Sequence, residues 1–233
     1  MTDPHVVAKE YATLDRCALR RLDRTGWLRD AGEPIDTVLA SLAEVRPRRV
    51  LDAGSGDGGI AALVAAPEVI CLDRSQAAVD SARERGLDAV LGDIACLQFA
   101  DAEFDAVMCN WTLYHLPDLD RGLFELARVL RPGGRMVGAY NMPDHLCELW
   151  SAVGREVTAE SFTGQNGGQA LARHFDRVAR RDTGGDVLWE SREALQEYLD
   201  AYLELAGPLT APLAPYPFCA RRRNCVFVAD KTP

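Results

Sequence analysis

Two kinds of hydrophobic pattern alternate along the middle of the chain. Short apolar runs rich in β-branched residues are typical of buried strands. They lie at Val50–Asp52, Val69–Leu72, Ala89–Leu91, Phe104–Cys109 and Arg135–Ala139. Segments with helical spacing separate them, around Ile60–Val64, Ala77–Arg85 and Leu119–Leu130. This alternation predicts βαβ units in a doubly wound α/β domain, with a mostly parallel sheet covered on both faces.

Helical spacing also dominates the residues before the first strand. Apolar residues recur every three or four positions from Val6 to about Leu28, which predicts an amphipathic helix. A second helix begins near Ile35, and we expect Pro47 to stop it. After the third helical segment of the core, Arg131-Pro132-Gly133-Gly134 predicts a turn into the next strand.

The pattern changes beyond Asn141. Three helical segments, at His145–Val153, Gln169–Phe175 and Ala194–Leu205, have no parallel-strand partners and predict a helical cap. A glycine-rich turn at Gly164–Gly168 precedes the second of them. Two strand-like pieces, Arg177–Arg181 and Asn224–Ala229, frame the end of the cap and predict a terminal antiparallel pair.

Composition narrows the class of protein. The 233 residues are 48% hydrophobic and carry a formal net charge of -9, which is typical of a globular protein and disfavours nucleic acid as a partner. Short basic clusters at 46–49, 180–181 and 221–223 are better explained as solvated strand edges than as phosphate sites. No signal peptide or membrane-spanning stretch is apparent, so we expect a cytoplasmic protein without a membrane partner.

The cysteines and histidines do not predict a metal site. Seven cysteines form no C-x-x-C pair, and we interpret them as buried, reduced thiols. The histidines at positions 5, 145 and 174 are too scattered for a ligand set. We expect no metal.

A glycine-rich loop follows the first strand of the core. Val50–Gly59 reads V-L-D-A-G-S-G-D-G-G, and its glycines allow a sharp turn that brings main-chain amides close to a ligand at a helix N-terminus. Because Gly54, Gly56 and Gly59 also satisfy the G-x-G-x-x-G pattern, the loop alone leaves a nucleotide-dependent oxidoreductase open.

Acidic residues end the next two strands. Asp73 follows Val69–Leu72 and is placed to accept hydrogen bonds from both hydroxyls of a ribose. Asp93, in Gly92-Asp93-Ile94, brings a second carboxylate to the same edge of the sheet, where an adenine amino group would lie. A dinucleotide site does not ordinarily require this second acid.

These motifs, with F-D-A-V-M-C-N-W-T-L-Y-H-L at 104–116 and L-A-R-V-L-R-P-G-G at 126–134, resemble the class I S-adenosylmethionine-dependent methyltransferases. The resemblance covers about Arg49 to Tyr140 and is to the small-molecule branch, similar to the ubiquinone and menaquinone C-methyltransferases. It implies a Rossmann-like, mostly parallel seven-stranded sheet with an antiparallel terminal strand and a small helical cap. It also implies S-adenosylmethionine as cofactor and S-adenosylhomocysteine as product.

The resemblance also implies roles for individual residues. It places Asp52, Gly54 and Gly56 around the methionine part of the cofactor, Asp73 at the ribose, and Asp93 and Ile94 at the adenine. Arg74 would lie along the adenine ring, and Asn110 and Trp111 near the sulfonium, although core packing explains Trp111 equally well. Tyr11 and Arg16 of the N-terminal helix would meet the cofactor carboxylate.

His115 is the candidate general base, because imidazole titrates near neutrality. The alternative, which we favour, is that it only packs or hydrogen-bonds near the cofactor. Methyl transfer relies mainly on aligning the nucleophile with the methyl group and excluding water, so a strong base is not required.

We therefore predict a methyltransferase that methylates a small-molecule acceptor at oxygen, nitrogen or carbon by in-line displacement, as a monomer or homodimer. We divide the chain into N-terminal helices forming a lid (1–47), a cofactor-binding core (48–141), a helical cap with one core strand near 177–181 (142–219) and a terminal strand (220–233). The alternatives are a nucleotide-dependent oxidoreductase and a non-catalytic S-adenosylmethionine-binding partner protein.

Overall fold

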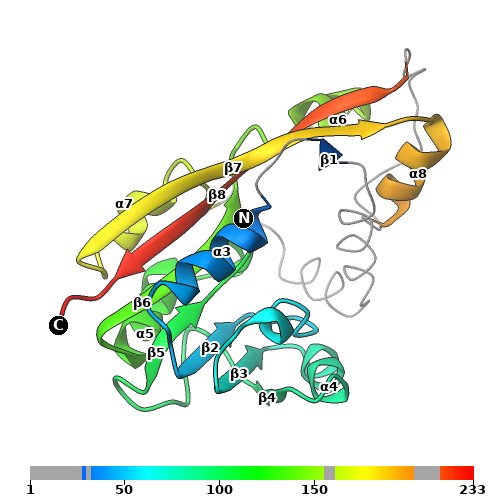
Figure 1. The fold of residues 1–233 in the computed structure, drawn as a ribbon. Helices are drawn as coiled ribbons and strands as arrows, with labels where there is room; N and C mark the ends of the chain where they lie inside the picture. The colour runs from blue at the N-terminus through cyan, green and yellow to red at the C-terminus, as the bar shows by residue number, and fades with distance from the viewer. Residues whose placement is uncertain (1–27, 30–32, 155–160, 202–215) are drawn as a thin grey trace.

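A computed structural model of the protein describes residues 28–29, 33–154, 161–201 and 216–233. One sheet runs through it, in the strand order β1-β7-β8-β6-β5-β2-β3-β4 (Figure 1). Its strands are β1 (Leu28–Arg29), β2 (Arg49–Ala53), β3 (Glu68–Asp73), β4 (Asp88–Leu91), β5 (Phe104–Met108), β6 (Leu130–Asn141), β7 (Arg177–Trp189) and β8 (Phe218–Asp230).

The direction of the strands confirms the predicted fold class. Strands β2 to β6 are parallel, and β8 is inserted antiparallel between β6 and β7. Seven strands thus make the expected mostly parallel sheet with one antiparallel strand. The two-residue β1 pairs antiparallel with β7 and adds a short eighth strand at that edge.

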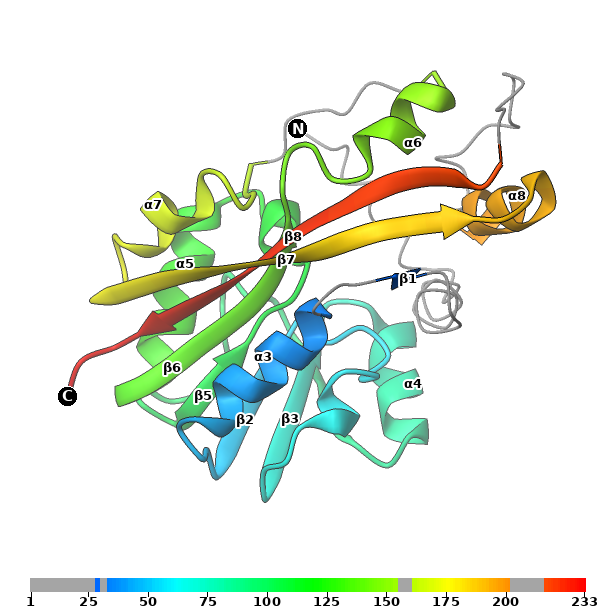
Figure 2. The same cartoon turned by 45° about the horizontal axis from the view of Figure 1, so that its top comes forward.

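Helices cover both faces of the sheet (Figure 2). Apolar residues of α3 (Pro34–Ala43) and α4 (Gln76–Glu84) pack on one face, and those of α5 (Leu119–Val129) and α7 (Gly167–Leu171) pack on the other. Two of these helices have N-cap residues. The side chains of Ser75 and Asp118 accept hydrogen bonds from backbone N–H groups in the first turns of α4 and α5. Both helices are close to their predicted ranges.

The ends of β7 and β8 extend beyond the core and carry a separate apolar cluster. Figure 2 shows α6 (Cys147–Ala152) and α8 (Arg192–Ala201) near these ends. Leu146 and Leu149 pack there with Trp189 of β7 and with Leu195 and Tyr198 of α8. The predicted strands Arg177–Arg181 and Asn224–Ala229 were therefore too short, because this second cluster buries strand residues that continue past the core.

Four local predictions need correction. Leu28 belongs to β1 and not to a helix, and α3 ends at Ala43, before Pro47. The predicted turn at Arg131–Gly134 is the irregular start of β6, where Gly133 adopts a positive φ of 75° and donates its N–H to the Lys231 carbonyl. The glycine-rich turn 164–168 overlaps α7, which begins at Gly167.

The basic clusters are largely neutralised by acids. Arg49 pairs with Glu103, Arg181 with Glu44 and Arg222 with Glu33. Arg222 is buried, so this arginine does not belong to a solvated strand edge. In the described ranges every helix is too short or too polar to cross a bilayer.

The cysteines differ from the prediction in one respect. The six in the described ranges are free thiols, and Cys71, Cys109 and Cys225 are buried as expected. Cys96 and Cys219 are exposed, because they lie in the turn after β4 and on the solvent side of β8.

Candidate active site

The glycine-rich loop leaves β2 at the carboxyl edge of the sheet. Gly54 and Gly56 have φ values of 76° and 56°, which only glycine adopts without strain. The Gly54 N–H donates to the Leu72 carbonyl at 2.7 Å and ties the loop to β3. A Cβ atom placed on Gly56 would have no heavy atom of the described residues within 4 Å, so this part of the loop is open with respect to them.

The helix that we expected after the loop is shorter than predicted. Residues Ala61–Leu63 form a single 3-10 turn, so the N–H groups of a full helix do not point at the loop. Asp57 instead organises the second half of the loop: its Oδ1 accepts the Gly59 N–H and its Oδ2 pairs with Arg85 Nη2 at 2.6 Å. The sequence analysis missed this ion pair, because Arg85 lies 28 positions away along the chain.

Asp73 sits beneath the same loop. Its side chain is buried, and its two carboxylate oxygens accept the N–H groups of Gly56 and Ser75, each at 2.9 Å. Each carboxylate oxygen can accept more than one hydrogen bond, so these contacts leave capacity for a ligand. Asp73 therefore shapes the loop as well as facing the edge where a ribose is predicted.

The residues predicted at the adenine lie at the ends of β3 and β4. Asp93 is exposed, and its Oδ1 accepts the Ala95 N–H at 2.8 Å. Ile94 is buried in the main apolar cluster, while Arg74 is exposed. The Gly92 N–H donates to the Asp73 carbonyl at 3.0 Å, which joins the two strand ends.

Asp52 and Asn110 lie at the ends of neighbouring strands β2 and β5, and both are buried. The Oδ1 atom of Asn110 accepts the Ala139 N–H at 2.9 Å. Its Nδ2 group is also buried and has no hydrogen-bond partner within the part of the chain that the structure describes. Such a donor is unusual in a folded protein and requires a partner that the described residues do not supply.

Trp111 combines packing with a polar contact. Its backbone has a φ of 48°, and its half-buried indole packs against the apolar cluster that α3 covers. The indole Nε1 donates to Asn141 Oδ1 at 3.0 Å, and Asn224 Nδ2 donates to the same oxygen at 2.8 Å. Core packing is thus observed for Trp111, and its contact with the sulfonium stays a prediction. The sequence analysis did not single out Asn141 or Asn224, which only strand pairing brings to Trp111.

His115 ends the 3-10 turn Leu113–His115 that follows Trp111. Its ring meets the Tyr114 ring edge to face, with 4.3 Å between the centroids. It lies in the segment that follows β5, which ends at Met108, on the same edge of the sheet as Asn110. Tyr11 and Arg16 lie outside the described residues.

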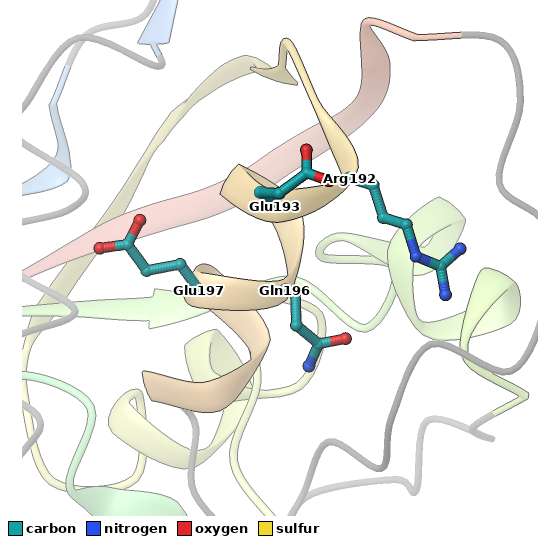
Figure 3. A pocket seen from close by; sticks show the side chains of 4 residues that line it. All are labelled: Arg192, Glu193, Gln196 and Glu197. Atoms are coloured by element: carbon teal, nitrogen blue, oxygen red, sulfur yellow. The ribbon is translucent and has the colours of Figure 1, made fainter.

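A shallow depression lies on α8. Figure 3 shows Arg192, Glu193, Gln196 and Glu197 around it, pointing in different directions. Since these side chains do not converge on a common point, the depression does not resemble a binding site. Within the described ranges, no group of three or more potential ligands forms a metal site.

Known proteins share this architecture. Residues 51–138 match the family model described as a methyltransferase domain. Over these residues the chain is similar to that family. This matched methyltransferase domain contains the glycine-rich loop, Asp73, Asp93, Asn110 and His115.

Two curated relatives match the methyltransferase domain and its surroundings. The chain is 36% identical over 135 residues to a malonyl-[acyl-carrier protein] O-methyltransferase of Pseudescherichia vulneris, covering 54% of this chain and 53% of the relative. It is 35% identical over 159 residues to a demethylmenaquinone methyltransferase of Deinococcus radiodurans, covering 64% and 62%. The matches thus span little more than half of these relatives.

A solved structure extends the likeness to most of the fold. The YcgJ protein of Bacillus subtilis superimposes with a TM-score of 0.62, covering 86% of this chain and 98% of its own, at 17% sequence identity. At this identity the likeness concerns the fold alone. Because it covers 86% of the chain, it extends beyond residues 51–138.

Proposed function

We propose that the protein transfers a methyl group from S-adenosylmethionine to a small-molecule acceptor by in-line displacement. The observation that carries this proposal is the grouping of the Gly54–Gly56 loop, Asp73 and Asn110 along one edge of the sheet. It combines open space beside the loop, a buried carboxylate and a buried donor without a partner among the described residues. These features fit an adenosyl cofactor.

The residues that would hold the cofactor divide by chemistry. Asp73 would accept the ribose hydroxyls, Asp93 and Ile94 would border the adenine, with Arg74 along the ring, and Asp52 and the loop glycines would surround the methionine part. Asn110 Nδ2 is suited to an acceptor atom of that part. When bound, the cofactor supplies an electrophilic methyl group on a positively charged sulfur.

The chain's own contribution is to hold the acceptor in line and to exclude water. Trp111 forms a rigid wall beside Asn110, because the contact with Asn141 fixes its indole. His115 would border the acceptor, as a base or as a packing residue. We further propose that residues 142–219 select the acceptor and that 1–47 cover the cofactor, in a cytoplasmic monomer or homodimer.

The relatives support a small organic acceptor. Their names describe methylation of a malonyl-[acyl-carrier protein] and of demethylmenaquinone. These names belong to the relatives, and half-length matches do not transfer an individual substrate. For this chain we propose a small-molecule acceptor with an oxygen, nitrogen or carbon nucleophile.

Calorimetric titration with S-adenosylmethionine, S-adenosylhomocysteine and NADH tests the proposal. We expect micromolar binding of both adenosyl ligands and no binding of NADH. Binding of NADH alone would overturn the proposal in favour of an oxidoreductase. Binding of S-adenosylmethionine without S-adenosylhomocysteine formation across a panel of small alcohols, phenols, amines and quinols would favour a non-catalytic binding protein.

A further inference from the structure

A row of polar side chains crosses three strands beside Trp111. Asn141 of β6 is paired with Asn224 of β8, and Asn224 is paired with Thr183 of β7. Directly opposed residues of neighbouring strands project from the same face of a sheet, with Cβ atoms about 5 Å apart. The three side chains therefore form one row, at the carboxyl end of β6 where the site lies.

The orientation of the Asn224 amide follows from Trp111. An indole Nε1–H is only a donor, so the atom that it meets at 3.0 Å on Asn141 must be the amide oxygen. That oxygen also receives the Asn224 amide at 2.8 Å, so the contacting atom of Asn224 must be Nδ2. Asn224 Oδ1 is consequently the amide atom that does not contact Asn141.

Two atoms in this row have no hydrogen-bond partner within the described residues. They are Asn224 Oδ1, on a side chain that is 3% exposed, and Thr183 Oγ1. Leaving a buried polar atom unpaired costs about 1–3 kcal/mol, so each such atom requires a physical explanation. Asn224 Oδ1 needs a donor, and the Thr183 hydroxyl can donate or accept.

The charges around the row are compensated. Arg222 lies two residues from Asn224 on the same face and pairs with Glu33 at 3.3 Å. Arg181 lies two residues from Thr183 and contacts Ser41 at 2.8 Å and Glu44 at 3.0 Å. A charged ligand group would therefore find no unmatched counter-charge here, which favours an uncharged group.

We propose that Asn224 and Thr183 form a subsite that binds a hydroxyl group of the methyl acceptor. A hydroxyl both donates and accepts, so it can donate to Asn224 Oδ1 while accepting from Thr183 Oγ1. A carboxylate only accepts, so it cannot satisfy Asn224 Oδ1. An ammonium could donate to both atoms, but its charge would find no unmatched acid among the described residues around the row. This inference rests on the proposed function, since it places the acceptor beside Trp111, and it deepens that function by naming the class of acceptor.

Phenol and fluorobenzene are the probes, because they share a ring and differ in the hydroxyl. Each is titrated into isotope-labelled full-length protein, with and without S-adenosylhomocysteine, while NMR follows the signals of Thr183 and Asn224. We expect phenol to shift these signals and fluorobenzene not to shift them. Equal shifts from both probes, or none from either, would overturn the proposal.

Thr183→Val and Thr183→Ser form a matched pair of variants. Valine keeps the shape but removes the hydroxyl, and we expect it to weaken phenol binding by about fivefold or more, whereas serine stays within about twofold. Substitution of Asn224 would also break its contact with Asn141, so Thr183 is the cleaner site. Unchanged phenol binding in Thr183→Val would overturn the proposal.

Thermal unfolding separates binding from a structural role. Since the hydroxyl lacks a partner among the described residues, Thr183→Val should leave the midpoint unchanged or raise it. A clearly lower midpoint would show that the hydroxyl serves the fold and would count against the subsite. Failure to bind S-adenosylhomocysteine would instead refute the proposed methyltransferase function. The phenol titration without S-adenosylhomocysteine tests the subsite independently of that function.

Discussion

Thr112 occupies the space that a side chain at position 54 would need. A Cβ atom on Gly54 would lie 2.4 Å from Thr112 Cγ2 and 2.5 Å from its Oγ1. The Thr112 hydroxyl donates to the Asn110 carbonyl at 2.8 Å, which holds this side chain over the loop. The loop after β2 and the segment after β5 are thus packed against each other where the cofactor is proposed to bind.

We predict that Gly54→Ala lowers the free energy of unfolding by about 2–4 kcal/mol, since it adds a steric contact to an unfavourable φ of 76°. Affinity for S-adenosylhomocysteine should fall at least about tenfold because the loop is displaced. Urea unfolding and calorimetry measure the two effects. Adding Thr112→Ala should restore part of the lost stability, and strict additivity of the two substitutions would contradict the contact.

Asp73→Asn should weaken S-adenosylhomocysteine binding by about tenfold or more, because one carboxylate oxygen becomes an amide donor and the charge is lost. One of the N–H contacts from Gly56 and Ser75 is broken as well. Asp88→Asn is the control, since Asp88 is an exposed acid at the start of β4. Calorimetry on the folded variants decides; an affinity within twofold of the unsubstituted protein would exclude the ribose role.

His115→Gln should keep S-adenosylhomocysteine affinity within about twofold while lowering turnover about tenfold or more, if the imidazole acts as a base. Turnover is followed as S-adenosylhomocysteine formation with an acceptor from the panel. Tyr114→Phe is the matched control for disturbance of the paired rings. Unchanged turnover in His115→Gln would assign the histidine to packing.

His145 should make stability depend on pH. Burial lowers its pKa to about 4, and its Nδ1 atom lies 3.1 Å from both the N–H and the carbonyl oxygen of Arg223. Between this value and the ordinary pKa of about 6.5, the unfolded chain binds more protons than the folded protein. Stability is therefore complete above about pH 6.5 and falls as the pH drops toward 4, by about 1–3 kcal/mol.

The variant His145→Asn isolates this effect, because its amide can donate to the Arg223 carbonyl or accept the Arg223 N–H without titrating. Urea unfolding at pH 7.5 and pH 5 should show a smaller loss of stability in the variant. The acids titrate in both proteins, so the difference between them reports on His145. The same pH dependence in both proteins would contradict the lowered pKa.

The alternation of apolar runs and amphipathic segments was sufficient to predict the core of the fold. Strands β2 to β5 and helices α4 and α5 lie close to their predicted ranges, because their period depends on neighbouring residues in the chain. The limits of β7 and β8 were not predictable in this way. Their length depends on a cluster that includes Leu149, Trp189 and Leu195, which are distant in sequence.

Motif order and spacing by themselves indicated the resemblance to methyltransferases, the glycine-rich loop and the strand-end acids, since these features are local and follow the chain. Tertiary structure decided which side chains share each contact. The ion pair of Asp57 with Arg85 joins residues 28 positions apart, and the contact of Asn224 with Asn141 joins residues 83 positions apart. Only sheet pairing brings such residues together, because hydrogen-bond partners are selected by distance in space and not by position along the chain.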